Sequence, residues 1–503
     1  MRIIIQMSIV SLILSISILT GYSGNFREGD WVNYTNFRYV TSVAMDQNIV
    51  YFGTTGGVLR YDRYAEKWLD PMTVTDGLPH SQIDNIAYDP TEDKVWVITP
   101  LGVAYYQVTF ERWYHDFQFP SGLARNDFRR SQFVLLNTEF GYFYQDGFLS
   151  DIHNQQFELT RGKDDGFDKL YVGTWGAGPV IIDTRYNDLK MIPFGPYSEN
   201  ITAVVMIDDQ LWLGDGASSL TSGAISVFDM YNDSWRWHQP RYTDGLGSAR
   251  LVSGSGDDKN IWLVTEYGLV NYNIGDDRFT TFADHANMPS TDMLSVAVFD
   301  DIVIAGTDNG IGYVDKKKRK KKNDKTDNDT IPENHIDRER FLGWDIYDLE
   351  IFGDYLYMAS DHGAMRKNIT ENTEFEYVDT PDKQLSAAVY DITEHHDTLY
   401  FATNRDIVLI DTRTGASDVI MDPSYFDRWH LRKITADSKH IWAATDIGLW
   451  RYRLSDGYER LYTVGDGMIS DDVRDLTLDG DFLWLATPKG LIRFYWNDPG
   501  RGD

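Results

Sequence analysis

The sequence predicts an all-β protein, a β-propeller built from about eleven four-stranded blades. Three observations lead to this fold class. One short motif recurs eleven times along the 503 residues. Its mean spacing is about 43 residues, which is the length of one propeller blade. The composition is rich in aromatic residues, at 14%, and contains 41 glycines, as strands and tight turns require.

The motif reads aromatic or aliphatic residue, any residue, small residue, threonine, two residues, glycine. We expect it to form the second strand of each blade, where the threonine hydroxyl bonds the turn backbone and the glycine supplies a positive φ. A strand precedes it, another follows it, and an outer fourth strand often carries Trp or Phe. Clear copies begin at Tyr51, Trp96, Trp262, Trp442 and Trp484, and weaker copies at Leu135, Tyr171, Trp212, Ile304, Tyr357 and Tyr400.

A second signature lies between the blades. Thr75-Asp-Gly-Leu-Pro79, Thr243-Asp-Gly-Leu246 and Gly465-Asp-Gly-Met468 share an Asp-Gly turn dipeptide, and Ser121-Gly-Leu123 is a looser copy. Asp-Gly marks a tight turn. We expect each copy to redirect the chain from an outer strand to the next inner strand.

Together, the "DGL" turn, the "WxGT"-like strand and the following strand resemble the two-component regulator propeller repeat. The first blade is also similar to the propeller of a cell-surface protein of the bacterial type IX secretion machinery. The first resemblance implies a periplasmic sensor propeller. The sequence shows no kinase, receiver or DNA-binding module after its blades, so we do not expect the sensing role to be inherited with the fold.

The N-terminus is typical of a secretory signal peptide over residues 1–23. Arg2 precedes an apolar stretch from Ile3 to Thr20, and small residues follow at Gly21 and Ser23. We therefore expect an exported protein that is periplasmic, cell-surface or secreted, with no membrane span after cleavage. The chain has no cysteine, which excludes disulfides, thiolate metal ligands and an N-terminal lipid anchor on cysteine.

Ring closure has two solutions at the level of sequence. The prediction is two rings, with blades 1–7 over 25–315, a basic and polar flexible linker over 316–340, and blades 8–11 over 341–503. Asp30–Tyr34 would complete blade seven, and Phe341–Trp344 would complete blade eleven. The alternative is a single ring over 25–503, with Asp30–Tyr34 completing blade eleven. In either case closure removes an exposed strand edge.

The charge pattern and motif search limit the possible functions. A formal net charge of −30 disfavours a nucleic-acid partner. The run Lys316–Lys322 is interpreted as part of a solvated loop. His395-His396 is expected in a hairpin turn rather than a metal site, and Arg501-Gly-Asp503 carries little information. We find no catalytic motif, and we expect no metal and no cofactor.

Four residues are candidates for ligand contact. Trp175 occupies a turn that normally holds small residues, and Trp235, Trp237 and His238 form a second aromatic cluster. The leading hypothesis is an exported, non-enzymatic protein that binds or scaffolds an envelope protein, a peptide or a glycan, with a role in sensing or secretion. The alternative is a propeller lyase or hydrolase acting on a polysaccharide or small molecule. The sequence does not define the ligand or the oligomeric state.

Overall fold

The computed structural model is an all-β protein with ten antiparallel sheets among its described residues. The structure describes residues 29–123, 143–145, 147–186, 188–217, 222–282, 288–316, 340–381, 383–403, 406–420 and 430–499. The predicted signal peptide over 1–23, nearly all of the predicted linker over 316–340 and Arg501–Asp503 lie outside these residues. Within them, no helix has the length and apolar character needed to cross a membrane.

The repeat motif is confirmed as the second strand of a sheet at nine of its eleven positions. The copy at Tyr171 forms β13, the fourth strand of a six-stranded sheet, and the copy at Leu135 lies outside the described residues. The predicted turn chemistry is also confirmed. For example, Thr487 Oγ1 donates to the carbonyl of Gly490 at 2.7 Å, and Gly490 has a φ of +146°. A Cβ at Gly490 would lie 2.5 Å from the carbonyl oxygen of Tyr34. The glycine therefore lets the fourth strand approach the turn closely.

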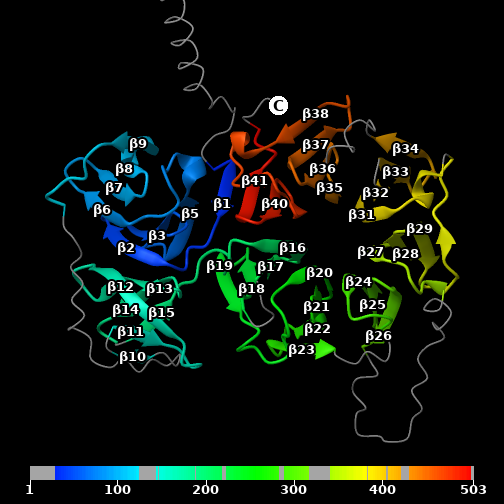
Figure 1. Ribbon diagram of the computed structural model, residues 1–503, viewed down its shortest axis with the longest axis horizontal. Coiled ribbons are helices and arrows are strands. Elements are labelled where there is room, and N and C mark those ends of the chain that lie inside the picture. Colours follow the sequence, from blue (N-terminus) through cyan, green and yellow to red (C-terminus); the bar gives the residue numbers. More distant parts are fainter. Residues whose placement is uncertain are drawn as a thin grey trace, which may run out of the picture.

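Seven sheets form a closed ring, which is visible on the right of Figure 1. Around it, the innermost strands contact one another in the order β16, β20, β24, β27, β31, β35, β39 and back to β16. The first three sheets contain β16 (Ile201–Ile207), β17 (Gln210–Asp215), β18 (Ile225–Asp229) and β19 (Ser234–His238); β20 (Leu251–Gly256), β21 (Asn260–Thr265), β22 (Gly268–Asn273) and β23 (Arg278–Phe282); and β24 (Met293–Phe299), β25 (Ile302–Thr307) and β26 (Gly310–Asp315).

The other four ring sheets follow in sequence, and the last takes its fourth strand from the N-terminus. They contain β27 (Ile346–Phe352), β28 (Tyr355–Ser360), β29 (Gly363–Asn368) and β30 (Glu376–Tyr377); β31 (Val389–His395), β32 (Thr398–Thr403), β33 (Ile407–Asp411) and β34 (Ser417–Ile420); β35 (Leu431–Ala436), β36 (His440–Thr445), β37 (Gly448–Arg453) and β38 (Glu459–Tyr462); and β39 (Asp475–Asp479), β40 (Phe482–Thr487), β41 (Gly490–Tyr495) and β1 (Trp31–Tyr34).

The remaining three sheets form an N-terminal lobe beside the ring, on the left of Figure 1. Its strand β2 contacts both β6 and β12, so the first sheet lies between the other two. The sheets contain β2 (Val40–Met45), β3 (Ile49–Thr54), β4 (Val58–Asp62) and β5 (Lys67–Met72); β6 (Asn85–Asp89), β7 (Lys94–Thr99), β8 (Gly102–Gln107) and β9 (Arg112–Asp116); and β10 (Phe143–Gln145), β11 (Phe148–Ser150), β12 (Gln156–Asp164), β13 (Lys169–Trp175), β14 (Pro179–Asp183) and β15 (Asp188–Met191).

The expected partition into 25–315 and 341–503 is wrong, because the two closing segments are exchanged relative to the prediction. Asp30–Tyr34 does not complete the sheet that ends at Asp315; β1 pairs with β41 instead, with Trp31 opposite Phe494. Phe341 takes the place beside β26, where its carbonyl lies 2.7 Å from the position of a Cβ on Gly310. The outer edges of these two sheets are therefore covered by β1 and by the segment around Phe341, so neither is exposed to pairing with another chain. The single ring over 25–503 is also wrong, since β39 contacts β16, but the closure of blade eleven by Asp30–Tyr34 in that alternative is confirmed.

The predicted Asp-Gly turns are confirmed between outer and inner strands. The 3-10 turns η1 (Val74–Asp76) and η7 (Val464–Asp466) each carry a capping box and end at a glycine with positive φ. Asn33 of β1 joins these two turns, because its Nδ2 donates to Thr75 Oγ1 at 2.7 Å and to the Gly467 carbonyl at 3.1 Å. Two further short 3-10 turns are η2 (Val108–Phe110) and η6 (Gln384–Ser386).

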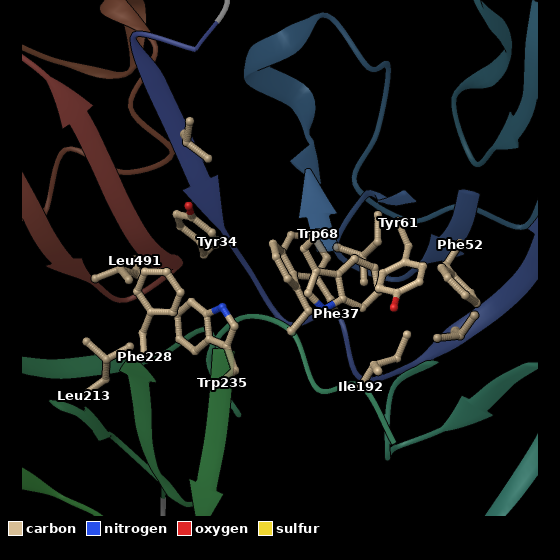
Figure 2. Packing of buried hydrophobic residues seen from close by; sticks show 14 of the residues in the cluster. Tyr34, Phe37, Phe52, Tyr61, Trp68, Ile192, Leu213, Phe228, Trp235 and Leu491 are labelled. Atoms are coloured by element: carbon tan, nitrogen blue, oxygen red, sulfur yellow. The ribbon is translucent and has the colours of Figure 1, made fainter. Parts of the chain in front are cut away.

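The lobe and the ring share one apolar core. Figure 2 shows Trp68 and Phe37 of the lobe side near Tyr34, Trp235 and Phe228 of the ring side. An ion pair joins the two parts, with Arg493 Nη2 2.9 Å from Asp70 Oδ2. Continuous burial of this kind holds two parts of a chain in a fixed arrangement.

The histidine pair lies in a hairpin turn between β31 and β32, as expected. His396 has a φ of +55°, and this left-handed residue brings its ring to 4.1 Å from the ring of His395. His395 is the last residue of β31 and His396 belongs to the turn, which is why the two rings lie together rather than on opposite faces of a strand.

Candidate binding site at the mouth of the ring channel

The inner strands of the ring share a local irregularity near their first residue. Six of the seven carry a register shift there, as between Ile346 and Asp348 in β27 or between Leu431 and Lys433 in β35. A bulge re-aims the side chains beside it. Here two successive residues at or just before the start of the inner strand line the central channel in five blades, whereas β16 contributes Thr202 and β24 contributes Leu294 at this level.

These residues make the channel strongly asymmetric. Four neighbouring blades, those with β27, β31, β35 and β39, supply all the aromatic and charged side chains at these positions. We call this set the charged wall: Tyr347, Asp348, Tyr390, Asp391, Arg432, Lys433, Arg474 and Asp475. The opposite side has small or aliphatic residues, including Thr202, Val252, Ser253 and Leu294. The two sides together enclose a cavity of about 350 Å³.

Three carboxylates of the charged wall connect each blade to the next. Asp348 Oδ2 accepts the backbone N–H of Ile392 at 3.0 Å, and Asp391 Oδ2 accepts that of Ile434 at 2.7 Å. Asp475 Oδ2 accepts the N–H of Val204 at 2.8 Å, across the closure of the ring. The carboxylates therefore stabilise the ring while they line its channel.

Lys433 provides a positive charge among these three carboxylates. Its Nζ lies 2.8 Å from Asp391 Oδ1 and 3.9 Å from Asp348 Oδ1. Burial alone would lower the pKa of Lys433, but the charges of Asp348, Asp391 and Asp475 raise it well above its usual value. Burial raises the pKa of Asp391, and the lysine opposes that change. The lysine is thus held in its charged form.

Two arginines stand at the entrance to the channel in fixed positions. Arg432 Nη1 donates to Asp472 Oδ1 and to the Val473 carbonyl, and Arg474 Nη1 donates to Asn200 Oδ1 at 2.6 Å. About a third of each side chain remains exposed, at 34% and 29%. Burial lowers the pKa of Arg474, and the charge of Arg432 adds to this effect. The two arginines share one carboxylate, since Arg474 Nε also lies 3.9 Å from Asp472 Oδ2, so these three side chains leave a net positive charge at the mouth.

Two tyrosines of the charged wall occupy, in their blades, the same position as the two arginines. The rings of Tyr347 and Tyr390 lie 5.2 Å apart with an interplanar angle of 34°, and 36% of Tyr390 is exposed. Paired guanidinium forks can bind a carboxylate through charge-assisted hydrogen bonds, and neighbouring aromatic rings offer flat apolar area. The mouth therefore suits a ligand that carries both an acidic group and apolar groups.

The carboxyl group of Glu350 provides a test of the electrostatics of the charged wall. Glu350 is half-buried two residues beyond Asp348 on β27. Burial, aided by the charge of Asp348, raises its pKa from 4.5 to about 8, although Lys433 opposes the shift. The folded chain keeps this proton up to about pH 8, whereas the unfolded chain releases it near pH 4.5. The free energy of unfolding therefore falls as pH rises through this window.

We expect Glu350→Gln to remove that contribution, which approaches about 1.4 kcal/mol per pH unit. Urea unfolding at pH 5, 6, 7 and 8 should show the variant gaining stability over the wild-type protein as pH rises. The exposed Glu371→Gln serves as the control and should follow the wild-type curve. Parallel curves for wild type and Glu350→Gln would contradict the raised pKa.

The four residues proposed from sequence lie elsewhere, at the junction of lobe and ring. Trp235, Trp237 and His238 on β19 line a cavity there, next to Gly176. Trp235 is only 3% exposed and packs in the shared core. Trp175 is 48% exposed and packs against Tyr39, with ring centroids 5.1 Å apart.

The charged wall was missed from sequence, although a signal for it exists. Its pairs Tyr347-Asp348, Tyr390-Asp391, Arg432-Lys433 and Arg474-Asp475 occupy the same place ahead of successive repeat motifs. Aligning the first strands of the repeats, rather than the second strands alone, would have placed them in register. Within the described ranges, no three His, Cys, Asp or Glu side chains gather closely enough to hold a metal ion.

The sheet architecture defines this protein as a β-propeller with a discontinuous ring. No protein-family model matches the chain, and no curated protein sequence matches it. Among solved structures, it is similar to PorZ, described as an essential surface component of the type-IX secretion system of Porphyromonas gingivalis. The TM-score is 0.53 at 11% identity, over 93% of this chain and 87% of PorZ.

Further matches are to extracellular domains of two putative hybrid two-component systems from B. thetaiotaomicron. BT4673 matches with a TM-score of 0.46 at 14% identity, over 92% of this chain and 70% of that domain. BT3049 gives a TM-score of 0.32 at 14% identity, over 92% and 82% of the two chains. The resemblance predicted from the repeats is confirmed at the level of the fold, since PorZ, a component of the type-IX secretion system, is similar to this chain over 93% of its length.

Proposed function

We propose that this protein is an exported, non-enzymatic binding protein that holds a peptide segment of a partner protein at the mouth of its seven-bladed ring. The observation that carries the proposal is the one-sided charged wall. Its arginine forks are held by Asp472 and Asn200 and remain about one-third exposed. Held forks lose little side-chain entropy when an acidic group binds them.

Mixed charge in the channel favours a peptide over a glycan. The wall presents two arginines above three carboxylates and a lysine, and the facing side presents Thr202, Val252 and Leu294. A peptide can place an acidic group on the arginines, apolar side chains on the facing wall and backbone N–H groups toward the carboxylates. Export is supported by the signal-like N-terminus and by the fold similarity to a bacterial surface component.

A random peptide library tests this proposal with the whole mature protein as bait. We expect the selected peptides to share an acidic residue. Charge-assisted hydrogen bonds contribute about 1.5–3 kcal/mol each, so the double variant Arg432→Gln, Arg474→Gln should weaken binding at least tenfold. Arg413→Gln on an outer turn, where 71% of the side chain is exposed, is the matched control. Failure to select any peptide, or equal binding by the double variant, would refute the proposal.

The absence of catalysis is a separate part of the proposal. A panel of polysaccharide lyase and glycosidase substrates, assayed with and without divalent metal, should show no turnover. Metal-dependent turnover that disappears in a channel variant would support the alternative of a propeller lyase or hydrolase.

A further inference from the structure

A second cavity, of about 410 Å³, lies at the junction of the N-terminal lobe and the ring. Its wall combines the lobe residues Gln155 and Phe157 with the ring residues Trp237, His238 and Gln239. Arg38, on the segment between β1 and β2, also lines it. No residue of this junction cavity belongs to the channel, so it is an independent feature. Ligand pockets in proteins are commonly about 300–1,000 Å³.

The junction cavity contains a buried arginine that has no carboxylate partner among the described residues. Arg38 is 9% exposed. Its Nη1 donates to the Gly176 carbonyl at 3.3 Å, and its guanidinium carbon lies 3.4 Å from the centre of the Tyr197 ring. Burial raises the pKa of Asp215, which the charge of Arg38 lowers, and Asp151 lines the same cavity, but neither carboxylate forms a salt bridge with Arg38. A buried charge without a counter-charge is costly, so this guanidinium is suited to receive an anion.

Other polar groups of the junction cavity also have unused hydrogen-bonding capacity. Arg38 Nε is buried and has no hydrogen-bond partner in the described part of the chain, whereas the ring of His238 packs against Trp212 and Phe279. Gln155 Nε2 and the Tyr197 hydroxyl both donate to Gln239 Oε1, each at 3.2 Å. These bonds leave the side-chain oxygen of Gln155, Oε1, and the side-chain nitrogen of Gln239, Nε2, available to a ligand.

Aromatic rings form the apolar part of the same wall. Trp237 is held in place because its Nε1 donates to the Gly195 carbonyl at 3.0 Å. It meets Tyr197 edge to face, with ring centroids 5.7 Å apart, and Phe157 lies on the lobe side of the cavity. Fixed aromatic faces bind flat or ring-shaped groups at a low entropy cost.

We propose that the junction cavity is a binding site for a small carboxylate carried on a six-membered ring. Arg38 receives the carboxylate, the aromatic side chains contact the ring, and the side chains of Gln155 and Gln239 bond its polar substituents. The ring is either a sugar or an aromatic ring. Both share the same carboxylate chemistry, and the experiment separates them.

Calorimetric titration of the mature protein uses glucuronate and benzoate as probes, with glucose and benzyl alcohol as their uncharged counterparts. We expect at least one carboxylate to bind with a dissociation constant below about 1 mM, and neither neutral compound to bind. Binding of glucuronate alone identifies a sugar acid, and binding of benzoate alone identifies an aromatic acid. Absence of binding by both carboxylates, or equal binding of a neutral counterpart, would overturn the proposal.

Two variants locate the binding. Arg38→Met should weaken it at least tenfold. Gln155→Glu should also weaken it at least tenfold, because it places a competing carboxylate in the wall of the same cavity as Arg38. This variant keeps the test valid if Arg38→Met does not fold. Arg185→Met, an arginine of the same lobe with 63% of its side chain exposed, should bind as the wild-type protein does. Unchanged affinity in Gln155→Glu would overturn the assignment.

Discussion

Trp31→Ala is expected to destabilise the ring by about 3–5 kcal/mol, which is usual for removal of a buried tryptophan. Trp31 is 4% exposed. Its ring stacks on the ring of Phe494, with the centroids 3.7 Å apart and an interplanar angle of 4°. Phe494 lies on β41, the strand with which β1 pairs. Urea unfolding measures the loss. Trp175→Ala removes a half-exposed tryptophan and should cost less than about 1 kcal/mol.

Hydrogen exchange shows where the Trp31→Ala variant is weakened. Since β1 pairs with β41, we expect amide protection to fall first in Gly490–Tyr495. Loss of protection in Gly310–Asp315 instead would mean that β1 closes the sheet of β24–β26, as the partition from sequence supposed. That result would contradict the discontinuous ring.

Lys433→Met should leave the carboxylates of Asp348, Asp391 and Asp475 without their shared counter-charge. Breaking a buried ion pair typically costs about 3–5 kcal/mol. Because 38% of the Lys433 side chain is accessible from the channel, water screens part of this effect, and we expect about 2 kcal/mol at pH 7. The loss should shrink as pH falls, since burial raises the pKa values of Asp391 and Asp475 and both take up protons early.

A double-mutant comparison identifies the cause of that loss. Adding Asp391→Asn to Lys433→Met removes one charge and keeps an oxygen for the Ile434 N–H. We expect this double variant to recover about half of the lost stability. Equal destabilisation at pH 5 and pH 8, with no recovery, would show that Lys433 acts through packing rather than charge.

The repeat pattern predicted the sheets well because each blade is a local unit. The threonine and glycine of the motif determine the turn within one blade, as the Thr487–Gly490 bond shows. Ring closure depends instead on which distant segment covers each outer edge. Asp30–Tyr34 and Phe341–Trp344 both have an aromatic character suited to either edge, so strand propensity alone does not separate them.

The candidate site was harder to predict from the sequence than the sheets were, for a related physical reason. Trp175, Trp235, Trp237 and His238 attracted notice as individual aromatic residues. The charged wall depends on equivalent positions in four blades that meet only when the ring closes, as the Asp475 bond to Val204 illustrates. Arg38 is equally hard to recognise, because its surroundings come from the lobe, the linker before β16 and strand β19.

Photocrosslinking at Tyr390 tests the central claim, that the channel mouth is where the partner binds. The photoreactive residue p-benzoylphenylalanine replaces Tyr390, which lies in the charged wall and is 36% exposed, or Tyr231, which is 84% exposed on an outer turn. Illumination with a selected peptide should give a crosslink from position 390 and none from position 231. A crosslink from 231, with none from 390, would place the binding surface outside the channel and contradict the account.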